Sequence, residues 1–530
     1  MMEGKMIIYQ LLPRLFGNEN PSCIPNGSIK ENGSGTFIDI NVAALSAIKR
    51  LGVTHIWPTG VLEHASATDY SSFGISPVDR SLVKGKAGSP YAIRDYYDVC
   101  PDLARDVPNR LEEFTALVDR CHTLGLKVIM DFVPNHIFRG YASDVKPVDC
   151  VDFGKENFYY LSNTELILPV KSDYKEVPAR ASGNNCFRPD PHVNDWYETV
   201  KLNYGSDMQP MDTWFKMRDI LSFWASKGVD GFRCDMAEMV PTPFWAWVIP
   251  QIKTGCNHPI FIAEIYRPEL YRAFVNSGFD YLYDKVGLYD TIKAVSRGEL
   301  PAEEISRCWQ KLGDLQPFML NFIENHDEQR IASDFLLGDG CKALPALVVS
   351  ACLHLCPFML YAGQEFGERG MDAEGYSGID GRTSIYDYWS VGSLRRFNNQ
   401  GQFNTEQLHP SERLLYGMYS NLFSLIASYS ALNRGATYDL VYANRHDRFN
   451  PERHFVFLRY SADQPDELFL IAVNFSDHSA DLEIYIPQDA FEHFGIEEQK
   501  LPSPIPISLS AWGVSIYSVF SKETIRSFVT

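Results

Sequence analysis

The segment NRLEEFTALVDRCHTLGLKVIMDFV, residues 109–133, joins two patterns that decide the fold class. Over 109–125, apolar residues recur three and four positions apart, which predicts an amphipathic helix. Gly125 is a residue type that commonly follows a helix C-terminus. The run KVIMDFV (127–133) is mostly apolar without alternation, as expected for a strand covered on both faces. A helix that leads directly into such a strand is typical of a parallel α/β fold.

The same kind of strand recurs through the first 430 residues, with helical patterns in between. The other candidates are MIIYQ (6–10), THIWPTG (54–60), VDGFRCD (229–235), IFIAEIY (260–266), FDYLYD (279–284), LNFIENHD (320–327) and PFMLYAG (357–363). Eight strands, each followed by helix, is the number found in a (β/α)8 barrel. We therefore predict an α/β protein built on a TIM barrel.

Two parts of the chain depart from this alternation. Residues 137–205, between the third and fourth strands, are irregular, polar and aromatic, and so long a connection is usually functional or a small inserted domain. From about residue 436, short alternating runs such as HFVFLRY and LFLIAVNF predict an antiparallel β-sandwich. We predict a barrel of residues 1–136 and 206–432, an insertion domain of 137–205 and a C-terminal β-sandwich domain of 433–530.

Composition and net charge limit the classes of molecule that the protein is expected to bind. The net charge of −19 over 530 residues argues against nucleic acid or an anionic membrane, because both favour basic surfaces. No apolar span reaches membrane length, and the N-terminus shows no signal-peptide pattern. The eleven cysteines are an odd number without a CxxC pair, which fits reduced thiols better than a disulfide framework. We predict a cytoplasmic protein.

Three acids stand at the carboxyl ends of predicted strands: Asp235, Glu264 and Asp327. In a barrel these ends open onto one face, where active sites are built. A single acid there is more often a helix cap or a solvated loop residue, but burying three costs several kcal/mol unless something compensates. Arg233 points to the same side as Asp235 by strand alternation and could hold one carboxylate ionised. Glycosidic bond cleavage needs such a set, with one acid to protonate the leaving oxygen and one carboxylate facing the oxocarbenium ion.

Four short motifs carry a family resemblance. DFVPNH (131–136), GFRCD (231–235), AEIY (263–266) and ENHD (324–327) resemble, in order and strand assignment, the four motifs of the α-amylase family, glycoside hydrolase family 13. The layout of barrel, insertion and C-terminal β-domain is also similar. The resemblance implies a retaining mechanism on α-linked glucosyl oligosaccharides or α-glucans. Asp235 would be the nucleophile, Glu264 the general acid and base, and Asp327 the residue that stabilises the transition state.

The resemblance also implies sugar-binding residues. His136 and His326 close two of the motifs and would bind the attacked sugar, although packed structural histidines are the alternative. SPYAIRDYYDV (89–99) resembles the family's segment after the second strand, so Tyr91 would stack on that sugar and Asp95 would be a supporting partner. An ordinary core tyrosine is the alternative for Tyr91. Further aromatic residues could line more subsites or form the small core of the insertion: Trp196, Tyr197, Tyr204 and Trp214.

The family's calcium site is where the sequence departs from the pattern. Many members hold calcium with the first-motif Asn, an Asp in a DLN-like segment and a His four residues after the nucleophile. Asn135 is present here, but VKLN (200–203) places Lys201 at the aspartate position, and Met239 stands at the histidine position. An ammonium repels a cation and a thioether is a poor ligand for a hard one. We predict no metal or other cofactor here, with the Lys201 ammonium in calcium's electrostatic role, unless VKLN is misaligned and the site is built elsewhere.

The activity itself has alternatives. Hydrolysis and transglycosylation use the same residues and differ in whether water or a sugar hydroxyl resolves the covalent intermediate. The segment GQEFGERG (363–370) resembles the family's eighth strand end, where Glu365 is expected to shape the loop and not to act in catalysis. An inactive amylase-like sugar-binding or interaction module is a further alternative. Such a module should lack at least one of Asp235, Glu264, Asp327 and Arg233, and all four are present.

Overall fold

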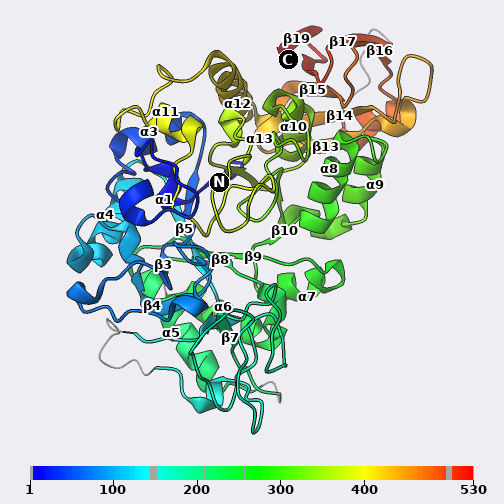
Figure 1. Ribbon diagram of the computed structural model, residues 1–530. Helices are drawn as coiled ribbons and strands as arrows, with labels where there is room; N and C mark the ends of the chain where they lie inside the picture. The colour runs from blue at the N-terminus through cyan, green and yellow to red at the C-terminus, as the bar shows by residue number, and fades with distance from the viewer. Residues whose placement is uncertain (1–3, 144–151, 207–208, 256, 497–503, 529–530) are drawn as a thin grey trace.

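The computed structural model describes residues 4–143, 152–206, 209–255, 257–496 and 504–528 (Figure 1). Eight parallel strands close into a barrel in the order β1-β12-β11-β10-β9-β8-β5-β2. Their bounds are β1 Ile7–Leu11, β2 His55–Pro58, β5 Lys127–Phe132, β8 Gly231–Cys234, β9 Ile260–Ala263, β10 Tyr281–Tyr283, β11 Met319–Phe322 and β12 Phe358–Tyr361. Each predicted strand segment contains or overlaps one of these strands, so the predicted TIM barrel is confirmed.

Large side chains fill the interior of the barrel. One buried cluster takes residues from seven of the eight strands: Ile8, Trp57, Ile129, Ile262, Tyr283, Leu320, Phe322 and Met359. These are the residues that alternation directs inward, and they make the barrel a packed core and not a pore. The remaining barrel strand, β8, places Arg233 in register with Ile262. The side chain of Arg233 is fully buried. The barrel therefore carries a positive charge in its own interior.

Helices cover the outside of the barrel (Figure 1). The helix predicted over 109–125 is α4 (Arg110–Thr123), which buries Phe114, Leu117, Val118 and Cys121 at the predicted spacing, and Gly125 follows it with φ of 67°. The other α-helices are α1 Pro13–Phe16, α2 Ile29–Asn32, α3 Val42–Arg50, α5 Asp212–Ser226, α6 Thr242–Gly255, α7 Tyr271–Asn276, α8 Asp290–Ser296, α9 Glu304–Gln310, α10 Leu344–Cys352, α11 Gly392–Asn398, α12 Pro410–Ser428, α13 Ser430–Asn433 and α14 Gln488–Phe494.

The long connection after β5 is joined at its base by a short antiparallel pair. β6 (His136–Phe138) pairs with β7 (Thr199–Lys201), and His136 lies opposite Lys201. The two ends of the segment therefore leave the barrel side by side, which supports our proposal that 137–205 form an inserted domain. A second small pair, β3 (Leu62–His64) and β4 (Ile93–Val99), follows β2 outside the barrel.

The described residues from β13 to β19 form an antiparallel sheet domain, as predicted. Five strands pair in the order β13 (Ala436–Asp439), β14 (His454–Ser461), β15 (Gln464–Asn474), β18 (Val514–Ser518) and β19 (Glu523–Phe528). A second, two-stranded sheet joins β16 (Ala480–Ile484) to β17 (Ile505–Leu509), and apolar residues of both sheets belong to one core cluster. In Figure 1 this domain lies at the opposite end of the molecule from β7.

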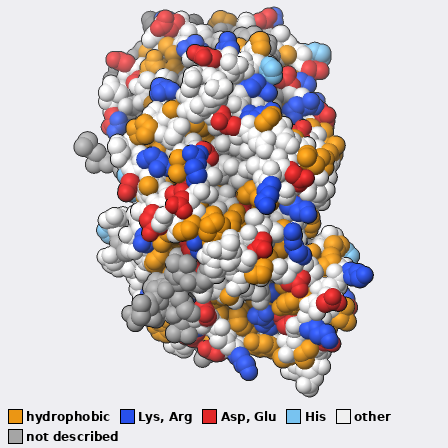
Figure 2. All heavy atoms as spheres, turned by 60° about the vertical axis from the view of Figure 1, so that its left-hand side comes forward, with side chains coloured by type: hydrophobic (Ala, Val, Ile, Leu, Met, Phe, Trp, Pro, Cys, Tyr) orange, Lys and Arg blue, Asp and Glu red, His pale blue; other side chains and the backbone are white. Residues whose placement is uncertain are grey.

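Acidic and basic side chains are interspersed on the face shown in Figure 2, although the chain has a net charge of −19. Among the residues that the structure describes, no helix combines the length and the apolar character needed to cross a membrane.

Candidate active site

A cavity of about 600 Å³ opens at the carboxyl ends of the barrel strands. It brings together five of the predicted site residues: Tyr91, His136, Asp235, Glu264 and Asp327. The rest of its wall comes from other segments, and these residues include Lys84, Trp196, Glu198, Met236, Tyr266, Tyr376, Arg382 and Tyr386. This is the face on which barrel enzymes build their sites, so the cavity is the candidate active site.

Arg233 lies beneath the cavity and touches two of its carboxylates. Its Nη1 donates to Asp235 Oδ1 at 2.8 Å, and its Nη2 forms an ion pair with Glu264 Oε1, also at 2.8 Å. The guanidinium is enclosed by the rings of Trp57, Tyr91 and Tyr283, each centred 5.3–5.6 Å away. One rigid, permanently charged fork therefore fixes both carboxyl groups, where the sequence predicted that it would hold only one.

Glu264 is held by two further donors that sequence reasoning did not identify. Tyr266 donates its hydroxyl to Glu264 Oε1 at 2.7 Å, and the backbone N–H of Met236 donates to Oε2 at 2.6 Å. Met236 has φ of 43°, in the left-handed region that costs energy for a residue with a side chain. This strained turn directly after Asp235 aims the N–H at the neighbouring carboxylate. Tyr266 could have been found in the sequence, because it is the last residue of the AEIY motif.

His326 is buried next to Tyr91 and Asp327, two residues that line the cavity. β11 already ends at Phe322, so alternation no longer sets the direction of residue 326. His326 Nε2 lies 2.5 Å from the Tyr91 hydroxyl and 3.1 Å from Asp327 Oδ2, and Nδ1 lies 2.7 Å from Gln10 Nε2. Burial lowers the pKa of His326 to about 3, so the ring is neutral. Nδ1 then accepts from Gln10, and Nε2–H is the donor that faces Tyr91 and Asp327.

The other predicted site residues lie at different depths. His136 lines the cavity against Trp196, with ring centroids 5.1 Å apart, and burial lowers its pKa to about 3. Asp95 does not line it, because its side chain is fully buried on β4 and accepts from Ser143 Oγ and the Tyr97 N–H. Of the aromatic candidates only Trp196 lines the cavity. Tyr197, Tyr204 and Trp214 are buried, and the last two pack on Phe244 of α6.

Burial raises the pKa of three acids in and behind the cavity: Asp235, Asp327 and Asp131. Burial and the Glu264 charge raise the pKa of Asp235, and the Arg233 charge opposes them. Burial likewise raises the pKa of Asp327, and raises that of Asp131, behind Arg233, to about 6. Several acids that share one guanidinium favour a state in which one carboxyl keeps its proton while another is ionised. Acid–base chemistry on a single substrate bond requires this division.

Comparison with known proteins identifies similar sequences and folds. Residues 10–255 match the family model described as "Alpha amylase, catalytic domain". This part of the chain is similar to the catalytic domain of the alpha-amylase family. The chain is 26% identical over 374 residues to alpha-amylase MalA of Haloarcula japonica, and 23% identical over 402 residues to a cyclomaltodextrin glucanotransferase of Bacillus sp. strain 1011. Each match covers 69% of this chain, but only 44% and 50% of those two relatives.

Solved structures share the alpha-amylase fold over nearly the whole chain. The maltogenic alpha-amylase AmyB of Thermotoga neapolitana has a TM-score of 0.61 at 19% identity, with 99% of each chain covered. The cyclic alpha-maltosyl-(1→6)-maltose hydrolase of Arthrobacter globiformis has a TM-score of 0.63 at 18% identity, with 97% of each chain covered. At such low identities these likenesses show the fold alone.

The place of the alpha-amylase family's calcium is faced by an ammonium group. Lys201 Nζ donates to Asn135 Oδ1 and to the backbone carbonyl of Met239, the latter at 2.9 Å. The side chain is buried, and this lowers the pKa of Lys201 to about 8. Both oxygens that could face a cation are therefore satisfied by a protein cation, so these residues do not fit calcium. Within the described ranges, no group of three or more His, Cys, Asp and Glu side chains could hold a metal.

The Lys201→Met variant should be less stable than the wild type. The change leaves Asn135 Oδ1 and the Met239 carbonyl buried without a donor, which costs about 2–4 kcal/mol of unfolding free energy. EDTA should leave the Tm and activity of the wild type unchanged, and calcium should not restore the variant. Urea unfolding with and without each additive measures this. A wild-type Tm that drops in EDTA would contradict the substitution of calcium by Lys201.

Glu365 is a buried structural acid, as the sequence predicted for a loop-shaping residue. It accepts from the Tyr9 hydroxyl at 2.5 Å and from the Gly363 N–H at 2.9 Å, and it does not line the cavity. Burial raises its pKa from 4.5 to about 7. A raised pKa in the folded state stabilises the fold below pH 4.5, and this contribution is lost as the pH rises through 7.

The difference in unfolding free energy between the wild type and the Glu365→Gln variant should therefore become smaller as the pH rises. Between pH 5.5 and 8.5 the wild type should lose about 2 kcal/mol of unfolding free energy relative to the variant. Denaturant titrations at the two pH values measure this difference, and Glu112→Gln on the exposed face of α4 serves as the control. A gap that widens with pH would show that Glu365 is ionised more easily in the folded state than in the unfolded chain.

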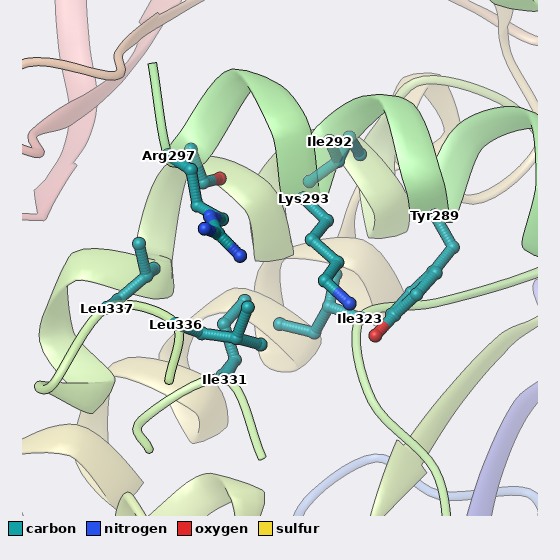
Figure 3. Close-up of a pocket in the computed structure, with 9 residues that line it drawn as sticks. Tyr289, Ile292, Lys293, Arg297, Ile323, Ile331, Leu336 and Leu337 are labelled. Atoms are coloured by element: carbon teal, nitrogen blue, oxygen red, sulfur yellow. The ribbon is translucent and has the colours of Figure 1, made fainter. Parts of the chain in front are cut away.

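A separate small pocket lies between α8 and the segment after β11 (Figure 3). Its walls are mainly apolar, with Ile292 of α8 opposite Ile331 and Leu336, and its volume is about 10 Å³. This is room for about one water molecule, so the pocket is a packing gap and not a second substrate site.

Proposed function

We propose that this protein is a retaining glycosidase that acts on α-linked glucosyl oligosaccharides or α-glucans. The observation that carries the proposal is the Arg233 guanidinium in contact with both Asp235 and Glu264 at the floor of a cavity that Asp327 also lines. Retention of configuration requires two neighbouring carboxyl groups, one nucleophilic and one acidic. A single guanidinium that touches both keeps them neighbours.

The proposed mechanism has two steps. The Asp235 carboxylate attacks the anomeric carbon and forms an ester bond, while Glu264 donates its proton to the glycosidic oxygen that leaves. Glu264 then takes a proton from water, whose oxygen attacks the anomeric carbon and releases Asp235. The contacts of Arg233 and Met236 fix the two carboxyls during both steps. Asp327 supplies negative charge beside the oxocarbenium-like transition state, and aromatic walls such as Tyr91 and Trp196 suit the flat faces of sugars.

Transglycosylation is the second candidate, because a family relative is a cyclomaltodextrin glucanotransferase. A substrate panel tests both candidates: maltose, maltotriose, panose, trehalose, sucrose, cyclodextrins, pullulan and starch. We expect NMR of the first product to show the α-anomer, and a β-anomer would contradict retention. Products longer than the substrate would show transfer, and shorter products alone would show hydrolysis.

We further propose a cytoplasmic location with an oligosaccharide and not a nucleic acid as partner. Every cysteine in the described ranges is a free thiol, including the partly exposed Cys23, Cys186, Cys308 and Cys341. Free thiols of this kind persist best in a reducing compartment.

A further inference from the structure

A second large cavity, of about 650 Å³, lies at the other end of the barrel. Its wall includes the first residues of four barrel strands: Ile7, His55, Lys127 and Tyr281. These are the amino-terminal ends, whereas Asp235, Glu264 and Asp327 follow the carboxyl ends of their strands. The outer wall comes from α12 and from Asn433 and Arg434 at the end of α13, directly before the C-terminal sheet begins. The cavity is thus separate from the candidate active site and lies where the barrel meets the C-terminal domain.

Every charged side chain among the described residues of this wall is basic. Lys5, Lys49, Lys127 and Arg434 come from four separate segments, and no Asp or Glu is among the described residues of the wall. This is unexpected in a chain with 67 acidic and 48 basic residues. Lys5 Nζ donates to the His354 carbonyl at 2.6 Å, and Lys49 Nζ to the Gly125 carbonyl at 2.9 Å. Both partners are neutral, so these contacts position the ammonium groups without balancing their charge.

Burial differs among these cations, because Lys5 is buried whereas Lys49, Lys127 and Arg434 are exposed. Desolvation lowers the pKa of Lys5 to about 8, and burial together with the Lys127 and Lys49 charges lowers the pKa of His55 to about 3. Screening is weaker beside the buried Lys5 than on an open surface, so an anion placed there gains more from this cation. Like charges gathered in one hollow repel each other, and a bound anion would relieve that repulsion.

The other residues of the cavity wall indicate which further chemical groups a ligand should carry. Thr54 donates its hydroxyl to the Ile7 carbonyl, so His55 Nδ1 donates to Thr54 Oγ1 at 2.8 Å and Nε2 is left as an acceptor suited to a hydroxyl group. Phe423, Ile426 and Pro357 offer an apolar side. A ligand that fits carries negative charge, a hydroxyl group and a body with an apolar face. Its size is set by a volume in the usual range for small-molecule sites, roughly 300–1,000 Å³.

We propose that this cavity binds a phosphorylated sugar metabolite, either a sugar phosphate or a nucleotide, and that binding stabilises the junction between the barrel and the C-terminal sheet domain. The cationic groups meet the phosphate, His55 meets a hydroxyl, and the apolar side packs on the sugar or base. The site does not depend on the proposed glycosidase chemistry, because it contains none of those residues.

Calorimetric titration of the full chain with glucose 1-phosphate and with ADP tests the proposal. At least one should bind with a Kd below about 1 mM and raise the Tm. Titrations repeated with saturating maltotriose should give the same Kd, since the active site is elsewhere. Inorganic phosphate or sulfate at equal ionic strength should bind at least tenfold more weakly. If neither organic phosphate binds, or if the inorganic anions bind equally well, the proposal is overturned.

A double charge reversal at exposed positions locates the binding. Lys49→Glu with Arg434→Glu should weaken binding at least tenfold and leave the ligand-free Tm and the hydrolysis of maltotriose unchanged. The matched control is Lys155→Glu with Arg188→Glu, which changes the net charge equally at exposed positions outside the cavity. Equal binding by wild type and the Lys49/Arg434 variant would overturn the site, as would equal losses in the two double variants.

Discussion

Asp235→Asn should reduce kcat/KM for p-nitrophenyl maltotrioside by roughly 10⁴-fold or more, because the amide cannot form the glycosyl ester. The change keeps the size of the side chain but removes its charge. Arg233 would still face Glu264, so the cavity should keep its shape. The release of p-nitrophenol by purified wild type and variant measures the loss. Maltotriose should still bind, so KD from calorimetry should change far less than kcat.

Asp219→Asn, on the outside of the barrel in α5, is the matched control and should keep full activity. Covalent trapping makes the test specific to a nucleophile. A 5-fluoro-α-glucosyl fluoride should add one sugar mass to the wild-type peptide that contains Asp235, and none to the Asp235→Asn variant. A sugar attached to any other carboxylate, or equal activity in the two proteins, would show that Asp235 is not the nucleophile.

The barrel could be predicted because its signals are local. A parallel strand buried on both faces has a continuous apolar sequence, and an amphipathic helix such as α4 has apolar residues with a 3.6-residue period. Both patterns can be recognised without knowledge of the fold. The carboxyl end of each strand then places Asp235, Glu264 and Asp327 on one face. Site residues inside the four motifs were predictable for the same reason.

Features that depend on backbone direction beyond the strands were not predictable. The turn at Met236 requires a left-handed φ that no residue type in MAEMV suggests, and it supplies the N–H for Glu264. β11 ends at Phe322, so strand alternation gives no direction for His326, which contacts Tyr91. Asp95 stands in a recognisable segment, but β4 lies outside the barrel and turns its carboxylate toward Ser143 and away from the cavity. The basic cavity at the amino-terminal ends of the barrel strands is formed by segments hundreds of residues apart, so no local sequence pattern predicts it.

Glu264→Gln should affect substrates unequally, and this is the sharpest test of its role. With maltotriose, whose leaving group must be protonated, kcat/KM should fall about 10³-fold, within the usual range for general acid catalysis. With 2,4-dinitrophenyl maltotrioside, which leaves without a proton, the first step should be nearly as fast as in the wild type. The covalent intermediate should then accumulate, because no base activates water. A burst of dinitrophenol in stopped-flow measurements, followed by slow turnover, reports this.

Azide should restore turnover of the Glu264→Gln variant with the activated substrate, because it attacks the intermediate without losing a proton. The product should be the α-glycosyl azide, since two inversions at the anomeric carbon restore its configuration. Glu269→Gln, exposed on the same loop, should behave like the wild type. A variant that loses equal activity on both substrates and does not respond to azide would have lost the architecture around Arg233. Such a result would contradict the acid–base role of Glu264.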